Sequence, residues 1–312
     1  MKLLFLSKEN IPLAKAEAEA LLGKGRLDEN LLLIGTIRKT DRLAYTKVIG
    51  QVLFAANAKN IDKKIENYSW RKLIKGSFAV TVLANSKRSQ GLERRYGGIV
   101  YDTLKNPKVD LENPTTNLII IKTKKKYYVC IPEWENKEDF EARKSHKRPV
   151  NLPIGLHPKL ARACVNLTGS TTSIYDPFCG LGSFLIEGGL IGLQVIGSDI
   201  DERLIQLCSK NLTYYNIRNN RLFLQDALHI NKKYDYVVTD LPYGKNTKKI
   251  SKELYPSFIR VLEKILKKRA VVIFPSFYNA DQLLKKSKLK MKGRFKVYIH
   301  KSLSRIVYVL EK

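Results

Sequence analysis

Hydrophobic and polar residues follow two different patterns along this 312-residue chain. From about residue 170, short apolar runs alternate with amphipathic segments of ten or more residues. This pattern predicts strands at 173–178, 194–199, 221–226, 234–241 and 270–275, and helices at 183–192, 201–215 and 250–267. Strands separated by helices predict a parallel, doubly wound α/β sheet, and two last apolar runs at 295–300 and 305–311 predict a terminal hairpin.

The first half of the chain mixes strands and helices without that alternation, which predicts an α+β region. Asn10, Pro12 and Gly23 are the start and stop signals of a helix around "LAKAEAEALL". A second helix is predicted within residues 43–58. Further along, the pattern predicts a strand at 77–84, a helix at 91–105 and a hairpin with a lysine-rich turn at 117–132.

The charge of the chain is uneven, with a formal net charge of +28. Residues 1–150 hold 30 Lys and Arg against 17 Asp and Glu, residues 151–230 hold 6 against 6, and residues 231–312 hold 21 against 6. Because the middle is neutral and both flanks are basic, the distribution indicates that the flanks bind a polyanion such as nucleic acid. A general lysine bias of the genome is the alternative explanation.

Composition excludes several classes of protein. A hydrophobic content of 44% is sufficient for two domain cores, so the chain is not a disordered tail. Its four cysteines have no CxxC spacing and no nearby histidine pair, so we expect reduced, mostly buried thiols and no metal site. The short apolar start and the absence of long apolar runs predict a soluble cytoplasmic protein without a membrane partner.

Acidic residues follow the predicted strands of the second half. Asp176 opens "DPFCGLG" after the first strand, Asp199 closes the second, and Asp226 follows the third. Gly180 and Gly182 allow a ligand to approach the backbone at a helix N-terminus. Carboxylates at these strand ends suit the hydroxyls of a ribose and an exocyclic amine, which indicates a nucleoside site. A dinucleotide site stays open as an alternative, although the third glycine of GxGxxG is missing, and without a Walker lysine a P-loop NTPase is disfavoured further.

The fourth strand ends in "DLPYG", residues 240–244. Pro242 terminates the strand and stiffens the loop that follows it. The aromatic ring of Tyr243 suits stacking on a planar base, while the Asp240 carboxylate and the Leu241 carbonyl suit the two protons of an exocyclic amine. An ordinary end of a strand explains the proline and the glycine, but not all four residues at this edge. We therefore predict a loop that activates a base amine for methyl transfer.

Taken in order, "DPFCGLG", "GSDID", "LQDA" and "DLPYG" resemble class I S-adenosylmethionine-dependent methyltransferases that act on amines. The segments "RPVNLPIGLHPKLARACVNLTG" and "IHKSLSRIVYVL" resemble, more narrowly, the archaeal and eukaryotic tRNA (guanine-10-N2)-methyltransferases. "LERRYGGIVYDTLKNPKVDLENPTTNLIII" resembles the RNA-binding THUMP domain.

The resemblance implies an architecture. The expected domains are a ferredoxin-like piece at 1–50, a THUMP domain at 51–140, a linker at 141–157 and a Rossmann-like methyltransferase domain at 158–312. The methyltransferase domain is expected to hold a mostly parallel seven-stranded sheet with a terminal β-hairpin.

The resemblance also implies site residues and partners. Residues 240–243 (Asp240, Leu241, Pro242, Tyr243) are expected to be catalytic. The expected S-adenosylmethionine contacts are Asp176, Phe178, Cys179, Gly180, Gly182, Asp199, Ile200, Asp226 and Ala227. Expected RNA contacts are Arg94, Arg95, Lys124, Lys125, Lys245 and Arg305, although a solvated surface explains each one singly. The implied partner is tRNA, and some relatives also need a small zinc-binding activator subunit.

Three other functions compete with guanine-N2 methylation of tRNA. The first is methylation of a guanine at another RNA position, and the second is N6-adenine methylation of DNA, because the same loop serves both chemistries. The third is a non-catalytic RNA-binding protein with a vestigial enzyme domain, which is disfavoured because every expected motif position is filled.

Overall fold

The computed structural model describes residues 1–35, 41–84, 87–150, 155–243, 247–300 and 303–312. Contacts divide these residues into two compact units. Unit 1 comprises residues 1–8, 24–41 and 46–136, and unit 2 comprises residues 9–23, 42–45 and 137–312. Each unit has its own sheet and its own hydrophobic core, and the two are described separately below.

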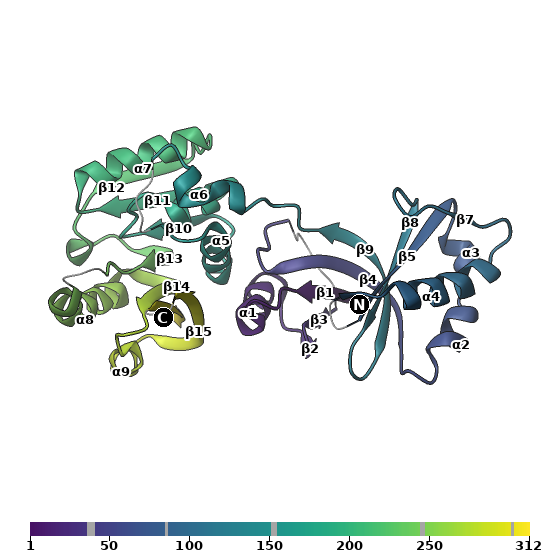
Figure 1. The fold of residues 1–312 in the computed structure, drawn as a ribbon. Helices are drawn as coiled ribbons and strands as arrows, with labels where there is room; N and C mark the ends of the chain where they lie inside the picture. The colour runs from purple at the N-terminus through teal and green to yellow at the C-terminus, as the bar shows by residue number, and fades with distance from the viewer. Residues whose placement is uncertain (36–40, 85–86, 151–154, 244–246, 301–302) are drawn as a thin grey trace. The chain divides into compact units, whose positions relative to one another are not determined.

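Unit 1 is built on a sheet in the order β2-β3-β1-β4-β9-β8-β5-β6, with β7 beside β5 (Figure 1). Its strands are β1 (Lys2–Leu6), β2 (Arg26–Asp28), β3 (Leu31–Ile34), β4 (Thr46–Ala56), β5 (Ser77–Ala84), β6 (Lys87–Arg88), β7 (Lys108–Val109), β8 (Thr116–Lys122) and β9 (Tyr127–Glu135). Helices α2 (Ile61–Glu66), α3 (Trp70–Leu73) and α4 (Gln90–Asp102) lie together on one side of this sheet. Trp70 and Tyr96 are fully buried in the core between helices and sheet.

The prediction of a second helix within residues 43–58 was wrong. The segment forms strand β4, which pairs antiparallel with both β1 and β9. Thr46, Val48, Ile49 and Val52 are β-branched, and such residues lose side-chain freedom in a helix but pack well on a sheet. The apolar residues of this segment are also compatible with the spacing of a helix, but hydrogen bonding to β1 and β9 makes the segment a strand.

The other predictions for the first half are confirmed. Helix α1 (Ile11–Leu22) begins after Asn10, whose side chain accepts a hydrogen bond from the Leu13 amide at 3.2 Å. Strand β5 and helix α4 occupy the predicted segments, and β8 pairs antiparallel with β9 across the lysine-rich turn. Contacts assign α1 to unit 2, although the strands on either side of it belong to unit 1. The four-part division predicted from the sequence stays a prediction.

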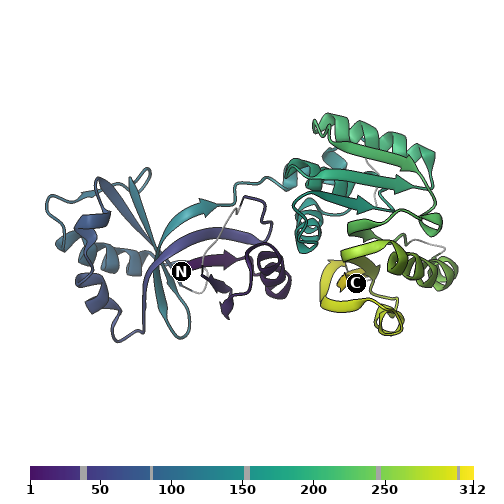
Figure 2. The same cartoon turned by 180° about the vertical axis from the view of Figure 1, so that it is seen from behind.

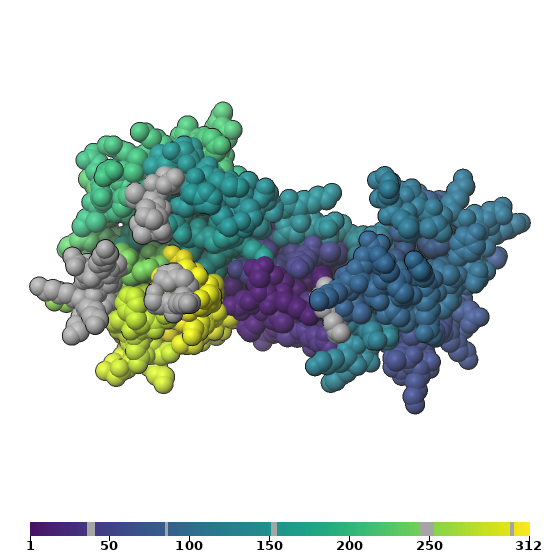
Figure 3. All heavy atoms as spheres, viewed as in Figure 1, coloured from purple at the N-terminus to yellow at the C-terminus, as the bar shows by residue number. Residues whose placement is uncertain are grey.

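Unit 2 contains the predicted doubly wound sheet, in the order β12-β11-β10-β13-β14-β16-β15. Its strands are β10 (Ser173–Asp176), β11 (Gln194–Asp199), β12 (Asn220–Leu224), β13 (Tyr234–Asp240), β14 (Leu266–Pro275), β15 (Lys290–His300) and β16 (Leu303–Glu311). The first five strands run parallel, and β15 and β16 form the predicted antiparallel hairpin. Figure 3 shows the yellow C-terminal strands at the surface of this unit.

Helices cover both faces of this sheet (Figure 2). The helices of unit 2 after α1 are α5 (Pro158–Leu167), α6 (Ser183–Leu190), α7 (Glu202–Tyr214), α8 (Thr247–Ile265) and α9 (Ala280–Lys285), with short 3-10 turns η1 (Glu141–Arg143), η2 (Ser145–Lys147) and η3 (Ala227–His229). Phe258 and Leu284, from α8 and α9, pack with Phe274 and Tyr308 of the sheet in one buried core. Parallel strands covered on both faces bind ligands at their carboxyl ends, which directs attention to that edge.

Candidate functional site

Three carboxylates stand where parallel strands of unit 2 end. Asp176 closes β10, Asp199 closes β11 and Asp240 closes β13. Because these strands run parallel, their carboxyl ends meet at one edge of the sheet. A cavity of about 330 Å³ opens there and is lined by all three aspartates. Its other predicted lining residues are Phe178, Cys179, Gly180, Ile200, Asp226, Ala227 and Pro242.

The turn between β10 and α6 needs two glycines for different reasons. Gly180 has a φ of +49° and lines the cavity, and a Cβ atom added to it would meet nothing within 4 Å. Gly182 has a φ of +83° and is the residue before α6, outside the cavity lining. A Cβ atom on Gly182 would lie 2.7 Å from the sulfur of Cys208. Gly180 therefore keeps the cavity open, whereas Gly182 allows the helix to pack.

Asp199 and Asp226 are held by backbone hydrogen bonds at the rim of the cavity. The amide of Gly180 donates to Asp199 Oδ2 at 3.0 Å, and the amide of Leu228 donates to Asp226 Oδ1 at 2.9 Å. Ile200 lies beside them and is 71% exposed. An exposed apolar side chain next to two oriented carboxylates provides a flat contact and hydrogen-bond acceptors for a nucleoside.

Asp176 is buried and linked to the neighbouring strand. Its Oδ1 accepts hydrogen bonds from the Thr239 hydroxyl at 2.8 Å and from the Phe178 amide at 3.1 Å. Burial raises the pKa of Asp176 to about 8, although both hydrogen bonds act in the opposite direction. A buried carboxyl of this kind is stabilised in its charged form by a cation, so this end of the cavity favours a positively charged ligand.

The loop after β13 is fixed on two sides. The amide of Leu241 continues the strand ladder by donating to the Ile273 carbonyl at 3.1 Å. The hydroxyl of the buried Tyr255, on α8, donates to the Pro242 carbonyl at 2.9 Å. The Leu241 side chain is fully buried, and neither it nor the half-buried Tyr243 contributes to the cavity lining. Gly244 lies outside the described residues.

Asp240 forms an ion pair that the sequence did not reveal. Arg305 Nη2, on β16, lies 3.1 Å from Asp240 Oδ2, and Arg305 itself is only 5% exposed. The other carboxylate oxygen, Oδ1, is buried and has no hydrogen-bond partner among the described residues. Burial raises the pKa of Asp240 to about 6, while Arg305 acts in the opposite direction. Burial and the Asp240 charge raise the pKa of Tyr243 to about 12.

The burial of Arg305 argues against its predicted role as an RNA contact, because a phosphate would have to reach a buried, paired guanidinium. Arg94, Arg95, Lys124 and Lys125 are exposed, as phosphate contacts need to be. Arg95 pairs with Asp62. Lys245 lies outside the described residues.

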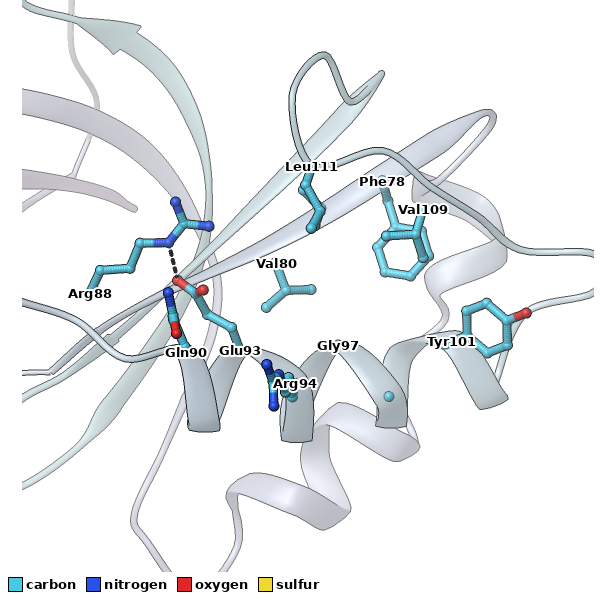
Figure 4. A pocket seen from close by; sticks show the side chains of 12 residues that line it. Phe78, Val80, Arg88, Gln90, Glu93, Arg94, Gly97, Tyr101, Val109 and Leu111 are labelled. Atoms are coloured by element: carbon cyan, nitrogen blue, oxygen red, sulfur yellow. Dashed lines mark hydrogen bonds and ion pairs between the residues drawn. The ribbon is translucent and has the colours of Figure 1, made fainter.

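Arg94 lines a second cavity, of about 480 Å³, in unit 1 (Figure 4). Val109 and Leu111 lie across this cavity from α4, and Arg88 Nε pairs with Glu93 Oε1 at 2.8 Å. Asp240, the carboxylate of the catalytic prediction, is in unit 2, so the larger volume of this cavity does not make it the reaction site.

Sequence reasoning missed several residues of the unit 2 cavity. Gly155 and Leu156 line it, although they fall in the predicted linker. The remaining unpredicted lining residues are Pro177, Leu181, Ser183, Phe184, Leu204 and Leu254. Pro177, Leu181 and Ser183 belong to or adjoin the glycine turn, so proximity in sequence was a usable signal for them. Leu254 comes from α8, and only the tertiary fold brings it to the cavity.

Two further observations concern metals and membranes. The described residues contain no group of three or more His, Cys, Asp or Glu side chains arranged to hold a metal ion. All four cysteines are free and buried, as predicted. Among the described residues, no helix has the length and apolar character needed to cross a membrane.

The residues of the cavity fit S-adenosylmethionine. Gly180 leaves open space against the turn, the buried Asp176 carboxyl suits a cationic group, and Asp199 and Asp226 offer acceptors beside the exposed Ile200. Asp240 Oδ1 has no hydrogen-bond partner in the described part of the chain, so it suits an N–H group of the molecule to be methylated. The donor set therefore accommodates both a nucleoside with a positive charge and a second, amine-bearing substrate.

Comparison with known proteins identifies the family of the chain. A model of the "RMKL-like, methyltransferase domain" family matches residues 145–305, and a THUMP domain model matches residues 55–131. The tRNA (guanine(10)-N2)-dimethyltransferase of Pyrococcus abyssi is 34% identical, with 96% of both chains covered. The protein of the same name from Methanothermobacter thermautotrophicus is 32% identical, with 99% of both chains covered.

Among solved structures, TrmN from Thermus thermophilus matches with a TM-score of 0.54 at 20% identity, covering 100% of this chain and 99% of that one. At that identity the likeness supports the fold alone, a THUMP-containing region followed by a class I methyltransferase domain. The two relatives that match over nearly their whole length decide the family: this chain belongs to the THUMP-containing tRNA (guanine(10)-N2)-methyltransferases.

Proposed function

We propose that this protein transfers one or two methyl groups from S-adenosylmethionine to the exocyclic N2 of guanosine 10 in tRNA. The observation that carries the proposal is Asp240, which lines a cavity that fits the methyl donor and whose buried Oδ1 has no partner within the ranges that the structure describes. The names of the two relatives supply the substrate, and their description as dimethyltransferases supports two successive transfers.

The residues of the site divide the work. Asp176, Asp199 and Asp226 hold the donor, which when bound supplies a methyl group whose bond to sulfur breaks with both electrons left on sulfur. Asp240 Oδ1 and the Leu241 carbonyl accept the two N–H groups of the guanine amine. This contact localises the nitrogen lone pair that forms the new bond to carbon, and Asp240 takes the proton that nitrogen then loses.

The target base must leave its stack to reach this loop. Pro242 and Tyr243 follow Asp240 directly, and the hydrogen bond from Tyr255 to the Pro242 carbonyl fixes the loop in place. Tyr243 is half-buried, so one part of its ring is available for stacking on a flipped base. The basic flanks of the chain supply the general attraction to the RNA backbone.

The experiment incubates the purified protein with an unmodified tRNA transcript and methyl-labelled donor, followed by nucleoside mass spectrometry. We expect N2-methylguanosine and N2,N2-dimethylguanosine, both absent when guanosine 10 of the transcript is replaced by adenosine. Asp240→Ala is expected to abolish methylation while tRNA binding changes by less than about threefold, because one loop carboxylate adds little to backbone binding.

The rival functions give different results in the same experiment. Methylguanosine that persists in the substituted transcript would move the target to another position, and methyladenine formed in duplex DNA would replace the RNA assignment altogether. A protein that binds tRNA but shows no donor binding by calorimetry would be a non-catalytic RNA-binding protein.

A zinc-binding activator subunit and a cytoplasmic location complete the proposal. Strand β12 ends the unit 2 sheet and exposes Phe223 and Leu224, so this edge has room for a partner that adds a strand. We expect co-purified activator to increase the methylation rate of the chain. Full activity of the chain alone, unchanged by the added subunit, would remove the activator from the proposal.

A further inference from the structure

Arg305 reaches Asp240 across an intervening strand. Asp240 pairs with Ile273 of β14, and two residues further along β14, Pro275 pairs with Arg305 of β16. The guanidinium thus spans β14 to place Nη2 at 3.1 Å from Asp240 Oδ2. Arg305 is only 5% exposed, and burying its guanidinium costs desolvation free energy that a charged partner offsets. The contact with Asp240 is therefore a buried ion pair and not an incidental surface contact.

The ion pair decides which oxygen of Asp240 is free. Arg305 occupies Oδ2, and Oδ1 remains buried without a partner among the described residues. A carboxylate that rotates about its terminal bond presents either oxygen to the substrate. A carboxylate held at one oxygen presents only the other, and its orientation is fixed before the substrate arrives.

Arg305 also contacts the aromatic residue of the same loop. Its guanidinium carbon lies 5.6 Å from the centre of the Tyr243 ring, within the range of a cation–π interaction. One side chain therefore bridges the two residues of the loop that are expected to bind the base, one by hydrogen bonding and one by stacking. A planar guanidinium suits this double contact, whereas a lysine ammonium supplies only a point charge.

We propose that Arg305 is a positioning residue for methyl transfer, which holds Asp240 in its charged form with Oδ1 toward the substrate amine and supports the ring of Tyr243. The inference rests on the proposed function, because it names a residue that acts through Asp240 on the same amine. It assigns Arg305 to the reaction site instead of the RNA-binding surface.

The electrostatics of the site support this role. The titratable groups that act on or respond to Asp240 are Asp176 from β10, Cys164 from α5, Tyr255 from α8, Tyr243 from the loop and Arg305 from β16. Arg305 is the cation in this set: burial raises the pKa of Asp240, Arg305 lowers it, and the net pKa is about 6. Loss of its charge raises the pKa of Asp240 further, so that less of the carboxylate is ionised at neutral pH.

The test compares the pH dependence of methylation in three variants of the full chain. Arg305→Gln removes the positive charge. Arg305→Lys keeps the charge but replaces the planar guanidinium by an ammonium group. Arg294→Gln is the matched control, because Arg294 lies on β15 in an exposed ion pair with Asp281, away from the loop. With tRNA as substrate, we expect the acidic limb of the kcat profile to move upward by about one pH unit or more in Arg305→Gln.

Arg305→Gln is expected to lower kcat at pH 7 by about 10- to 100-fold, with donor affinity changed by less than about threefold. Arg305→Lys should return the acidic limb toward its wild-type position but restore only part of kcat, because the contact with Tyr243 is not rebuilt. Arg294→Gln should match the wild type in both measurements. An unshifted acidic limb in Arg305→Gln, or equal kcat profiles in Arg305→Gln and Arg305→Lys, would overturn the inference.

A second measurement needs neither activity nor tRNA. A carbon-13 NMR titration of aspartate carboxyls, with Asp240→Asn to assign the signal, reports the pKa of Asp240 in the wild type and in Arg305→Gln. An upward shift in the variant supports the inference even if guanosine 10 proves not to be the target, and an unchanged pKa contradicts it. Circular dichroism confirms that each variant is folded before either measurement.

Discussion

At the scale of single residues, Gly180 and Gly182 lie in the same turn but are glycine for different structural reasons. Both have positive φ, where an L side chain costs about 1 kcal/mol. Gly180 borders open space in the cavity, whereas a Cβ atom on Gly182 meets the Cys208 sulfur at 2.7 Å. We therefore propose that Gly180 is required for ligand binding, whereas Gly182 is required for the packing of α6.

This difference predicts two separable effects of substitution by alanine. Gly180→Ala should lower the free energy of unfolding by only about 1 kcal/mol but weaken donor binding at least tenfold, because the methyl group enters the cavity. Gly182→Ala should lower the free energy of unfolding by about 2 to 4 kcal/mol, since strain and overpacking add. Urea unfolding and calorimetry with S-adenosylmethionine measure both effects. Equal losses of stability in the two variants would contradict the assignment.

At the scale of secondary-structure elements, helix α1 is attached to unit 2 through a buried carboxylate. Glu17 is fully buried, and its oxygens accept hydrogen bonds from the amides of Ala44 and Tyr45 at 2.7 and 2.8 Å. Asn166 Nδ2, on α5, donates to it at 2.7 Å. Burial raises the pKa of Glu17, and these hydrogen bonds act in the opposite direction. The helix is therefore joined to unit 2 by its packing against α5 and by a polar connection that its apolar pattern does not reveal.

Removing the charge of Glu17 should loosen this attachment. Glu17→Gln replaces one acceptor oxygen by a donor that faces other donors, so we expect the free energy of unfolding to fall by about 2 to 3 kcal/mol. Glu19→Gln, on the same helix, is the matched control, because Glu19 forms a partly exposed pair with Lys15 worth under about 0.5 kcal/mol. Urea unfolding followed by circular dichroism distinguishes the two, and equal midpoints would exclude the proposed role of Glu17.

At the scale of the whole molecule, the distribution of charge separates two kinds of binding. Residues 151–230 are balanced and contain the glycine turn, Asp176, Asp199 and Asp226, while both flanks are strongly basic. Binding of a polyanion releases counterions and weakens with salt, whereas binding of a small ligand in a neutral region does not.

We therefore expect the dissociation constant for tRNA to rise at least about tenfold between 50 and 200 mM salt. The dissociation constant for S-adenosylmethionine should change less than about twofold over the same range. Fluorescence anisotropy with labelled tRNA and calorimetry with the donor provide the two curves. A salt-independent affinity for tRNA would indicate that the flank charge is a bias of composition.

The sequence by itself determined what depends on neighbours along the chain. The alternation of strands and helices after residue 170, the Asn10 cap of α1, the glycine turn and the acidic ends of three strands all follow from patterns within a few residues. Parallel strands bring their carboxyl ends to one edge by necessity, so the sequence pattern alone places Asp176, Asp199 and Asp240 together.

Only the tertiary structure decided what depends on residues far apart. Strand β4 exists because β1 and β9 pair with both of its edges, and Leu156, which lies just before the start of α5, lines the cavity beside residues far from it in sequence. Arg305 is 65 residues from Asp240 in sequence, and its pattern fitted an exposed arginine on a strand. The register of β13, β14 and β16 made it the buried partner of Asp240, because hydrogen-bonded strands fix which side chains meet and local composition does not.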